Sequence, residues 1–206
     1  MKPSPELCNQ LDMLGHVYVP DVYDPDLGLS LGAELDLLFR TVKPRQIMAG
    51  EQLRNTERLL SNPDQHPNLT SALQAIGDFA ATVLSKSEFD RRLWPSALGR
   101  HALIQAIDMN PVTIRQLNKT SSTNIPSANR VYGAWHTDRP DIVDLVAITT
   151  YEGESKLEIK DTDTYTLCPG GVVFFDNRRR PQLWHRGYAD QPRRALGLAS
   201  IRNKIL

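Results

Sequence analysis

The chain has 206 residues, of which 40% are hydrophobic, and its 24 lysine and arginine residues balance 24 aspartate and glutamate residues. This length and apolar content suffice for one full core, so we expect a single domain spanning residues 1–206. A chain without net charge has no overall field to attract nucleic acid or an anionic membrane surface. No apolar run reaches the length of a membrane-spanning helix. We therefore expect neither a nucleic-acid partner nor a membrane partner.

The cysteines and the first residues bear on the compartment. Cys8 and Cys168 are far apart in the sequence and lie outside any C-x-x-C spacing, which predicts reduced thiols and neither a disulfide framework nor a thiolate metal site. The opening Met1–Glu6 lacks the apolar stretch of a secretory signal peptide. These features predict a cytoplasmic protein.

Residues 1–100 have mostly helical patterns. Residues 15–20 read as one isolated strand closed by Pro20, and Asp24-Pro25 has the residue types that open a helix. Leucines 27, 31, 35 and 38 then follow at helical spacing, and residues 69–84 carry the clearest amphipathic pattern. The patterns also predict helices over 49–60 and 88–94. These helices need a broad apolar surface to cover.

Residues 101–206 change to short strand-like runs separated by Gly, Pro, Asn and Asp. Several runs are apolar almost throughout, such as Val172–Phe175, which is typical of strands covered on both faces. A β-barrel or β-sandwich with helices packed on one face follows from this pattern. The predicted strands are 102–108, 112–118, 131–135, 143–151, 156–160, 165–168, 171–175, 182–186 and 194–201.

Three residues in this half have the chemistry of a metal site. His136 and Asp138 follow a predicted strand, two positions apart, and His185 lies in a later strand-like run. Two histidines and one carboxylate form a facial triad, which leaves three positions open on an octahedral iron(II) ion for substrate and dioxygen. The tripeptide His-x-Asp alone is a weak signal in a chain with five histidines, so the surrounding pattern decides its meaning.

The order of the surrounding motifs resembles the iron(II)/2-oxoglutarate-dependent oxygenase family across most of the chain. Residues 11–20, followed by a leucine-rich helix, are also similar to the opening of its phytanoyl-CoA-hydroxylase-like branch. The resemblance implies a mainly β fold with a helical N-terminal half, in which α-helices pack on one sheet of a double-stranded β-helix (jelly-roll, cupin-like) core. The matching blocks are Trp135–Asp138, Leu145–Tyr151, Lys156–Ile159, Pro169–Asn177, Trp184–Gly187 and Arg193–Leu198.

The same resemblance implies a reaction. Iron(II) held by His136, Asp138 and His185 would bind 2-oxoglutarate as cosubstrate and O2, and decarboxylation to succinate would accompany substrate oxidation. We expect hydroxylation of a small molecule, such as an amino acid or a natural-product intermediate. The alternatives are a protein or peptide hydroxylase of the same family and a cupin-like binding protein that performs no oxidation.

An arginine after the second histidine has a role in this interpretation. A dicarboxylate that chelates a metal at one end needs its other end neutralised inside a narrow barrel, which a guanidinium does with two parallel hydrogen bonds. Because neighbouring strand residues face opposite ways, either Arg193 or Arg194 points inward. We favour Arg193, whose face continues with small residues; the alternative is that both are surface arginines. The resemblance also makes Gln116 and Asn118 candidate cosubstrate contacts.

The remaining candidates are weaker. Trp135 and Trp184 flank the two histidines and should face away from the metal, so we expect them to pack in the core. Residues 178–180 are three arginines that either recognise an anionic substrate or form a solvated charge run. Tyr132 is either a cosubstrate contact or a core residue. His16, His66 and His101 have no partner at ligand spacing, and we expect them to be structural or exposed.

Overall fold

Helices dominate the first part of the chain and strands the second in the computed structural model. The model describes residues 4–41, 45–47, 50–53, 63–86, 112–117, 131–132, 135–138, 143–177, 182–189 and 193–201. The helices in these ranges are α1 (Pro5–Leu14), α2 (Gly28–Thr41) and α4 (Pro67–Lys86), with short 3-10 turns η1 (Pro25–Leu27) and η2 (Pro63–Gln65). The strands are β1 (His16–Val19), β2 (Arg45–Ile47), β3 (Gly50–Leu53), β4 (Val112–Leu117), β5 (Val131–Tyr132), β6 (Val143–Glu152), β7 (Ser155–Ile159), β8 (Thr164–Leu167), β9 (Val172–Asp176), β10 (His185–Ala189) and β11 (Arg194–Ile201).

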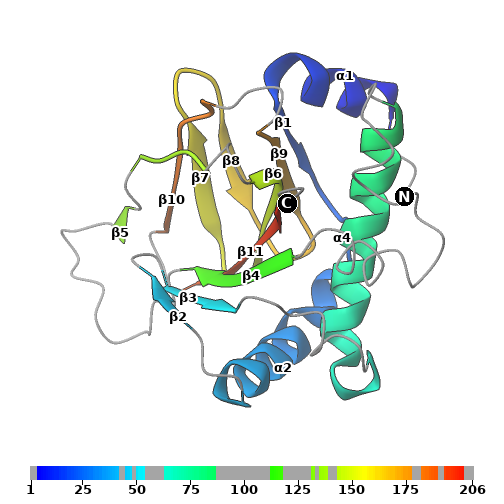
Figure 1. Cartoon of the computed structure of the whole chain (residues 1–206), viewed down its shortest axis with the longest axis vertical. Helices are drawn as coiled ribbons and strands as arrows, with labels where there is room; N and C mark the ends of the chain where they lie inside the picture. Colours follow the sequence, from blue (N-terminus) through cyan, green and yellow to red (C-terminus); the bar gives the residue numbers. More distant parts are fainter. Residues whose placement is uncertain are drawn as a thin grey trace, which may run out of the picture.

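The described strands form two antiparallel sheets. The larger has the order β1-β9-β6-β11-β4-β3-β2, and the smaller has the order β5-β10-β7-β8. Figure 1 shows α1 and α4 beside β1 and β9 of the larger sheet, on the side away from β10. The predicted double-stranded β-helix with helices packed on one sheet is therefore confirmed. No helix within the described ranges is long and apolar enough to span a bilayer.

Strand β6 shows how the larger sheet is covered on both faces. Leu145, Ala147 and Tyr151 belong to the cluster that contains the helix residues, whereas Val146 and Ile148 pack with residues of the smaller sheet. This alternation is the normal consequence of successive side chains pointing to opposite faces of a strand. The inner face of the larger sheet and the inner face of the smaller sheet thus enclose the barrel interior.

The N-terminal helix α1 was not predicted, although its ends carry ordinary capping residues. Ser4 Oγ accepts a hydrogen bond from the Leu7 amide at 3.3 Å, and Gly15 ends the helix with a φ of 76°. Such a left-handed terminal residue is commonly glycine because glycine lacks a Cβ. The following strand β1 is not isolated as predicted, because His16–Val19 pairs with β9 at the edge of the larger sheet.

The helices predicted from the leucine patterns are confirmed. Asp24 accepts a hydrogen bond from the Asp26 amide at 3.0 Å before η1 and α2, and the side chains of Leu31, Leu35 and Leu38 are buried. Helix α4 contains all of residues 69–84.

The local patterns fail at other positions. The predicted helix over 49–60 is wrong at Gly50–Leu53, which pairs with β4 as strand β3. In the predicted strand 131–135, Val131–Tyr132 form β5 but Trp135 is not in a strand. Strand β2 had no signal that we recognised. The predicted helix 88–94 and strand 102–108 lie outside the described residues.

Candidate metal centre

Backbone pairing brings the two histidines of the predicted triad together. His185 begins β10, and His136 lies in an extended segment that forms an isolated bridge with it. The His136 amide donates to the His185 carbonyl at 3.0 Å, and the His185 amide donates to the His136 carbonyl at 2.9 Å. The spacing of the two imidazoles is therefore set by main-chain hydrogen bonds, and Asp138 follows two residues after His136.

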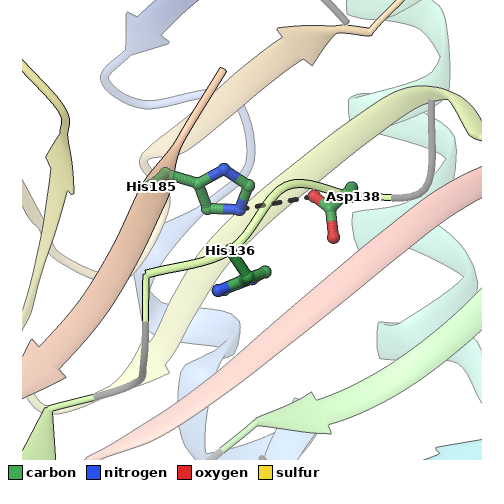
Figure 2. Close-up of side chains that lie close together, drawn as sticks. All are labelled: His136, Asp138 and His185. Atoms are coloured by element: carbon green, nitrogen blue, oxygen red, sulfur yellow. Dashed lines mark ion pairs between the residues drawn. The ribbon is translucent and has the colours of Figure 1, made fainter. Parts of the chain in front are cut away.

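The three side chains converge on one point. One ligand atom from each of His136, Asp138 and His185 lies within 4.8 Å of the others. Figure 2 shows the His185 ring directed at the Asp138 carboxylate, with Nε2 and Oδ2 3.4 Å apart, and the His136 ring beside them. Asp138 and His185 are buried, whereas His136 is exposed. The predicted triad is thus assembled at a point that solvent reaches on the His136 side.

The ring of His185 is held in one orientation. Its Nδ1 lies 3.0 Å from the carbonyl oxygen of Leu183, which can only accept, so Nδ1 is the donor and Nε2 is the nitrogen directed at Asp138. The Phe175 ring stacks on the His185 ring with centroids 4.7 Å apart and planes at 20°. A histidine whose second nitrogen donates to a carbonyl is the usual arrangement of a metal ligand.

Asn177 supports the segment that carries the carboxylate. Its side-chain nitrogen donates to the backbone carbonyl of Asp138 at 3.0 Å, and the residue follows β9 in a buried position. We noted residues 169–177 in the sequence as a matching block, but did not single out Asn177 or Phe175. Their role arises from contacts with residues far away in the sequence, which spacing does not reveal.

Arg193 and Arg194 lie on opposite sides of the larger sheet. Arg194 forms ion pairs with Asp36 of α2 at 2.5 Å and with Glu152 at 3.4 Å. Arg193 is only 5% exposed, and an ideal Cβ built on Gly187 would lie 3.5 Å from its Nη2. The structure thus places Arg193 inward, beside the strand that carries His185. Its role toward a cosubstrate stays a prediction.

Burial affects the charge of Arg193 without removing it. Desolvation lowers the pKa of Arg193 to about 10, which leaves the guanidinium protonated at neutral pH. A buried cation is stable in this position when an anion or hydrogen-bond acceptors compensate for lost hydration. The donor set therefore fits a divalent metal such as iron(II), and the buried guanidinium fits a carboxylate.

The expectation that the two tryptophans pack in the core is wrong. Trp135 is 37% exposed and Trp184 is 45% exposed. The guanidinium of Arg186 lies 4.6 Å above the Trp135 ring, and Arg186 Nε forms an ion pair with Glu158 at 2.6 Å. The alternation that directs the histidines inward places their neighbours on the outer face of the smaller sheet, which the described helices do not cover.

Other predicted residues differ in how far the structure describes them. His16 is fully buried and hydrogen-bonded to Tyr165, and His66 is also buried; neither belongs to the group of side chains at the candidate metal centre. Gln116 lies in β4 and Tyr132 in β5, but their side chains are outside the described structure. Asn118, Arg178–Arg180 and His101 lie outside the described residues.

Comparisons with known proteins identify the fold. No protein-family model and no curated protein matches the chain. A solved prolyl 4-hydroxylase from Phytophthora capsici has 16% sequence identity and a TM-score of 0.59, covering 99% of this chain and 64% of its own. The α-ketoglutarate-dependent carbocyclase SnoK from nogalamycin biosynthesis has 13% identity and a TM-score of 0.60, covering 97% of this chain and 84% of its own.

A third neighbour was solved with its ligands. The epimerase SnoN, in complex with Fe3+, α-ketoglutarate and nogalamycin RO, has 14% identity and a TM-score of 0.56, covering 95% of this chain and 82% of its own. α-Ketoglutarate is another name for 2-oxoglutarate. The likeness to these prolyl hydroxylase and α-ketoglutarate-dependent enzyme structures extends over nearly the whole chain, and this chain combines their double-stranded β-helix fold with a candidate His-Asp-His iron site.

Proposed function

We propose that this protein is an iron(II)- and 2-oxoglutarate-dependent oxygenase that hydroxylates a small molecule. The observation that carries the proposal is the convergence of His136, Asp138 and His185 within 4.8 Å on this fold. Arg193, which is buried beside the strand that carries His185, supports 2-oxoglutarate as the cosubstrate. The comparisons support the fold, and the side chains of this chain support the chemistry.

Each residue of the site has a distinct role in the proposed reaction. His136 and His185 supply neutral imidazole nitrogens and Asp138 supplies a carboxylate oxygen to hold iron(II). Bound iron(II) with 2-oxoglutarate supplies the activation of dioxygen and the oxidising power for a substrate C–H bond. Arg193 binds the far carboxylate of 2-oxoglutarate through charge-assisted hydrogen bonds. Gln116 and Asn118 are proposed as further cosubstrate contacts.

The substrate class is supported by the neighbours from nogalamycin biosynthesis. SnoK and SnoN belong to nogalamycin biosynthesis, and SnoN was solved with nogalamycin RO, a small molecule. The prolyl 4-hydroxylase neighbours make a peptide substrate the second candidate. Detection of an added oxygen atom by mass spectrometry, on a metabolite or on a peptide, distinguishes the two.

The first test is anaerobic titration of the protein with iron(II) and 2-oxoglutarate. We expect a weak visible charge-transfer band in the wild-type protein, and succinate when oxygen is admitted. The variants H185A and D138A should bind iron more than about a hundredfold more weakly, because a lost ligand costs more than the ten- to hundredfold effect of losing a supporting residue. The variant D26A, which changes an exposed carboxylate outside the site, is the matched control.

The outcome that contradicts the proposal is specific. If the wild-type protein develops no band and forms no succinate with metabolite and peptide panels, it is not an oxygenase of this type. Metal binding without either signal would favour the cupin-like binding protein instead. Equal iron affinity of D26A and D138A would show that the metal binds elsewhere.

A further inference from the structure

A short stretch of strand β10 lies between the candidate metal centre and Arg193. His185 and Gly187 are two residues apart and therefore face the same side of the strand. Their partners on β7 are Ile159 and Leu157, both buried in the cluster between the two sheets. Gly187 therefore faces the barrel interior, about 7 Å from His185 along the strand at the usual rise per residue.

Strand β11 of the larger sheet also carries small residues on its inner face. Gly197 of β11 pairs with Ile148 of β6, whose side chain packs in the interior cluster. Gly197 lies between Ala199 and Ala195, and Ala195 is two positions after Arg193 in the sequence. Gly197 therefore contributes no side chain to the barrel interior between positions 195 and 199 of β11.

The position of Gly187 relative to Arg193 determines what can approach the guanidinium. An ideal Cβ at residue 187 would be in van der Waals contact with Arg193 Nη2, at 3.5 Å, and 3.8 Å from the Lys156 carbonyl oxygen. A methyl group there fits without collision, but it occupies the space beside Nη2 where a carboxylate oxygen would bind. A larger side chain would extend over the space between His185 and Arg193.

We propose that Gly187 is the specificity-determining residue that admits the far carboxylate of a dicarboxylic 2-oxo acid to Arg193. A side chain at position 187 excludes that carboxylate while leaving the metal ligands in place. The inference rests on the proposed function, since it assumes that the 2-oxo acid chelates the metal held by His136, Asp138 and His185.

Three ligands distinguish binding at the metal from binding at Arg193. 2-Oxoglutarate reaches both the metal and Arg193. Oxalate also chelates a metal through oxygens on two adjacent carbons, but it is too short to reach Arg193. Glutarate has the far carboxylate but lacks the 2-oxo group. A change near Arg193 should therefore alter 2-oxoglutarate binding and leave oxalate binding as it was.

The experiment is calorimetric titration of the manganese(II)-loaded protein with these ligands, which needs no turnover. We expect G187A to weaken 2-oxoglutarate binding about tenfold and G187V about a hundredfold, the range of one or two lost charge-assisted hydrogen bonds. Oxalate and manganese affinities should change by less than about twofold in both variants. Glutarate, tested as a competitor, should displace 2-oxoglutarate from the wild-type protein and not from G187V.

A147V is the matched control, because it adds bulk to a buried residue of β6 that faces the helices and not the barrel interior. It should leave both affinities unchanged, and thermal melting checks folding in each variant. If G187V does not fold, the ratio of 2-oxoglutarate to oxalate affinity in G187A decides the question.

Two results overturn the inference while leaving the proposed function standing. One is wild-type affinity of G187V for 2-oxoglutarate, and the other is an equal loss of oxalate and 2-oxoglutarate binding. A wild-type protein that binds manganese and oxalate but not 2-oxoglutarate contradicts the proposed function itself.

Discussion

At the scale of single residues, Asn177 holds the carboxylate arm of the candidate metal centre by one hydrogen bond to the Asp138 carbonyl. Asn177 and Asp138 are both buried. Loss of the amide donor would therefore remove this hydrogen bond from the Asp138 carbonyl where water cannot readily replace it. The hydrogen bond reaches the main chain of Asp138 and not its carboxylate. Asn177 is therefore a positioning residue, which acts on the metal through Asp138.

Replacing Asn177 should weaken metal binding as well as lower stability. We expect N177A to weaken iron affinity about tenfold, the lower end of the effect of supporting residues, and to lower the free energy of unfolding by about 1–2 kcal/mol. Metal titration and urea unfolding measure the two effects separately.

The same-sized variant N177D is the second arm of this test. Its carboxylate cannot donate to the Asp138 carbonyl, so N177D should bind iron no better than N177A. A purely structural role for Asn177 would instead lower stability in both variants and leave the iron affinity and the absorption band as in the wild-type protein.

The grouping of His136, Asp138 and His185 could be predicted because its signal lies within short segments. The His136-x-Asp138 spacing and the strand around His185 are visible in the sequence alone. Alternation of strand side chains predicted that one of Arg193 and Arg194 points inward, and the small residues on the face of Arg193 favoured Arg193, which the structure places inward. Asn177, Gly187 and Phe175 could not be predicted, since their contacts exist only after separate strands have paired.

At the scale of elements, the N-terminus of helix α4 is capped by a side chain of helix α2. Both carboxylate oxygens of Glu34 in α2 accept hydrogen bonds from the first turn of α4: Oε1 from the Asn68 amide at 3.1 Å and Oε2 from the Leu69 amide at 2.7 Å. The Asn68 side chain adds a third, at 2.6 Å. Glu34 thus satisfies orphan N–H groups and places a negative charge at the positive end of α4.

Removal of this cap should destabilise the protein without changing its site. We expect E34A to lower the free energy of unfolding by about 1–2 kcal/mol, the usual cost of losing a helix cap. E154A, which removes an exposed glutamate from the β6–β7 turn, should cost less than about 0.5 kcal/mol. Urea unfolding compares the two, and equal losses would contradict the capping role.

The elements that could be predicted are those whose own residues are periodic. Helices α2 and α4 show leucine and mixed apolar stripes, and β6 and β9 show long apolar runs. Helix α1 buries only Cys8 and Leu11, which is too short a stripe to recognise. Gly50–Leu53 is polar, and its conformation depends on pairing with β4, so tertiary contacts override the local preference.

At the scale of the whole molecule, a polar cluster joins a terminal strand of the larger sheet to a terminal strand of the smaller sheet. Strands β1 and β8 are terminal in their sheets within the described structure. His16 Nδ1 of β1 lies 2.9 Å from the Tyr165 hydroxyl of β8, and the Tyr18 ring stacks on Tyr165. Asp163 lies 3.8 Å from His16 Nε2. His16 is completely buried in this cluster. Burial lowers the pKa of His16 below the ordinary value of 6.5, although the nearby Asp163 carboxylate raises it.

This lowered pKa predicts a pH dependence of stability. Between the folded pKa of His16 and 6.5 the unfolded chain binds more protons than the folded one, so stability rises with pH. The contribution is complete above about 6.5 and is lost as the pH falls below it. We expect the free energy of unfolding to decrease on acidification from about pH 7 to about pH 5, and H16Q to remove part of that slope.

Asp163 provides the matched variant for this prediction. Its negative charge raises the His16 pKa, so D163N should lower that pKa further and extend the pH-dependent loss to more acidic solution. Denaturant unfolding at a series of pH values measures both variants. Identical slopes for H16Q and the wild-type protein would show that His16 does not contribute.

The architecture was predictable from the change of period along the chain, from helical spacing before residue 100 to short strands after it. The sequence could not reveal that β1, far from its partner in the sequence, forms the edge of the larger sheet beside β9. Nor could it reveal that Trp135 and Trp184 are exposed, because alternation predicts the side of the sheet on which a residue lies and not whether another layer covers that side.

The reciprocal backbone hydrogen bonds between His136 and His185 have a consequence for how an ion is captured. Two of the three candidate ligands are already joined by one pair of main-chain hydrogen bonds, so little of the chain would have to be ordered on metal binding. Adjustment to ions of different radius then falls mainly on the Asp138 arm and its tether to Asn177. We therefore expect discrimination between metals to depend mainly on the position of Asp138, while the spacing of His136 and His185 stays fixed.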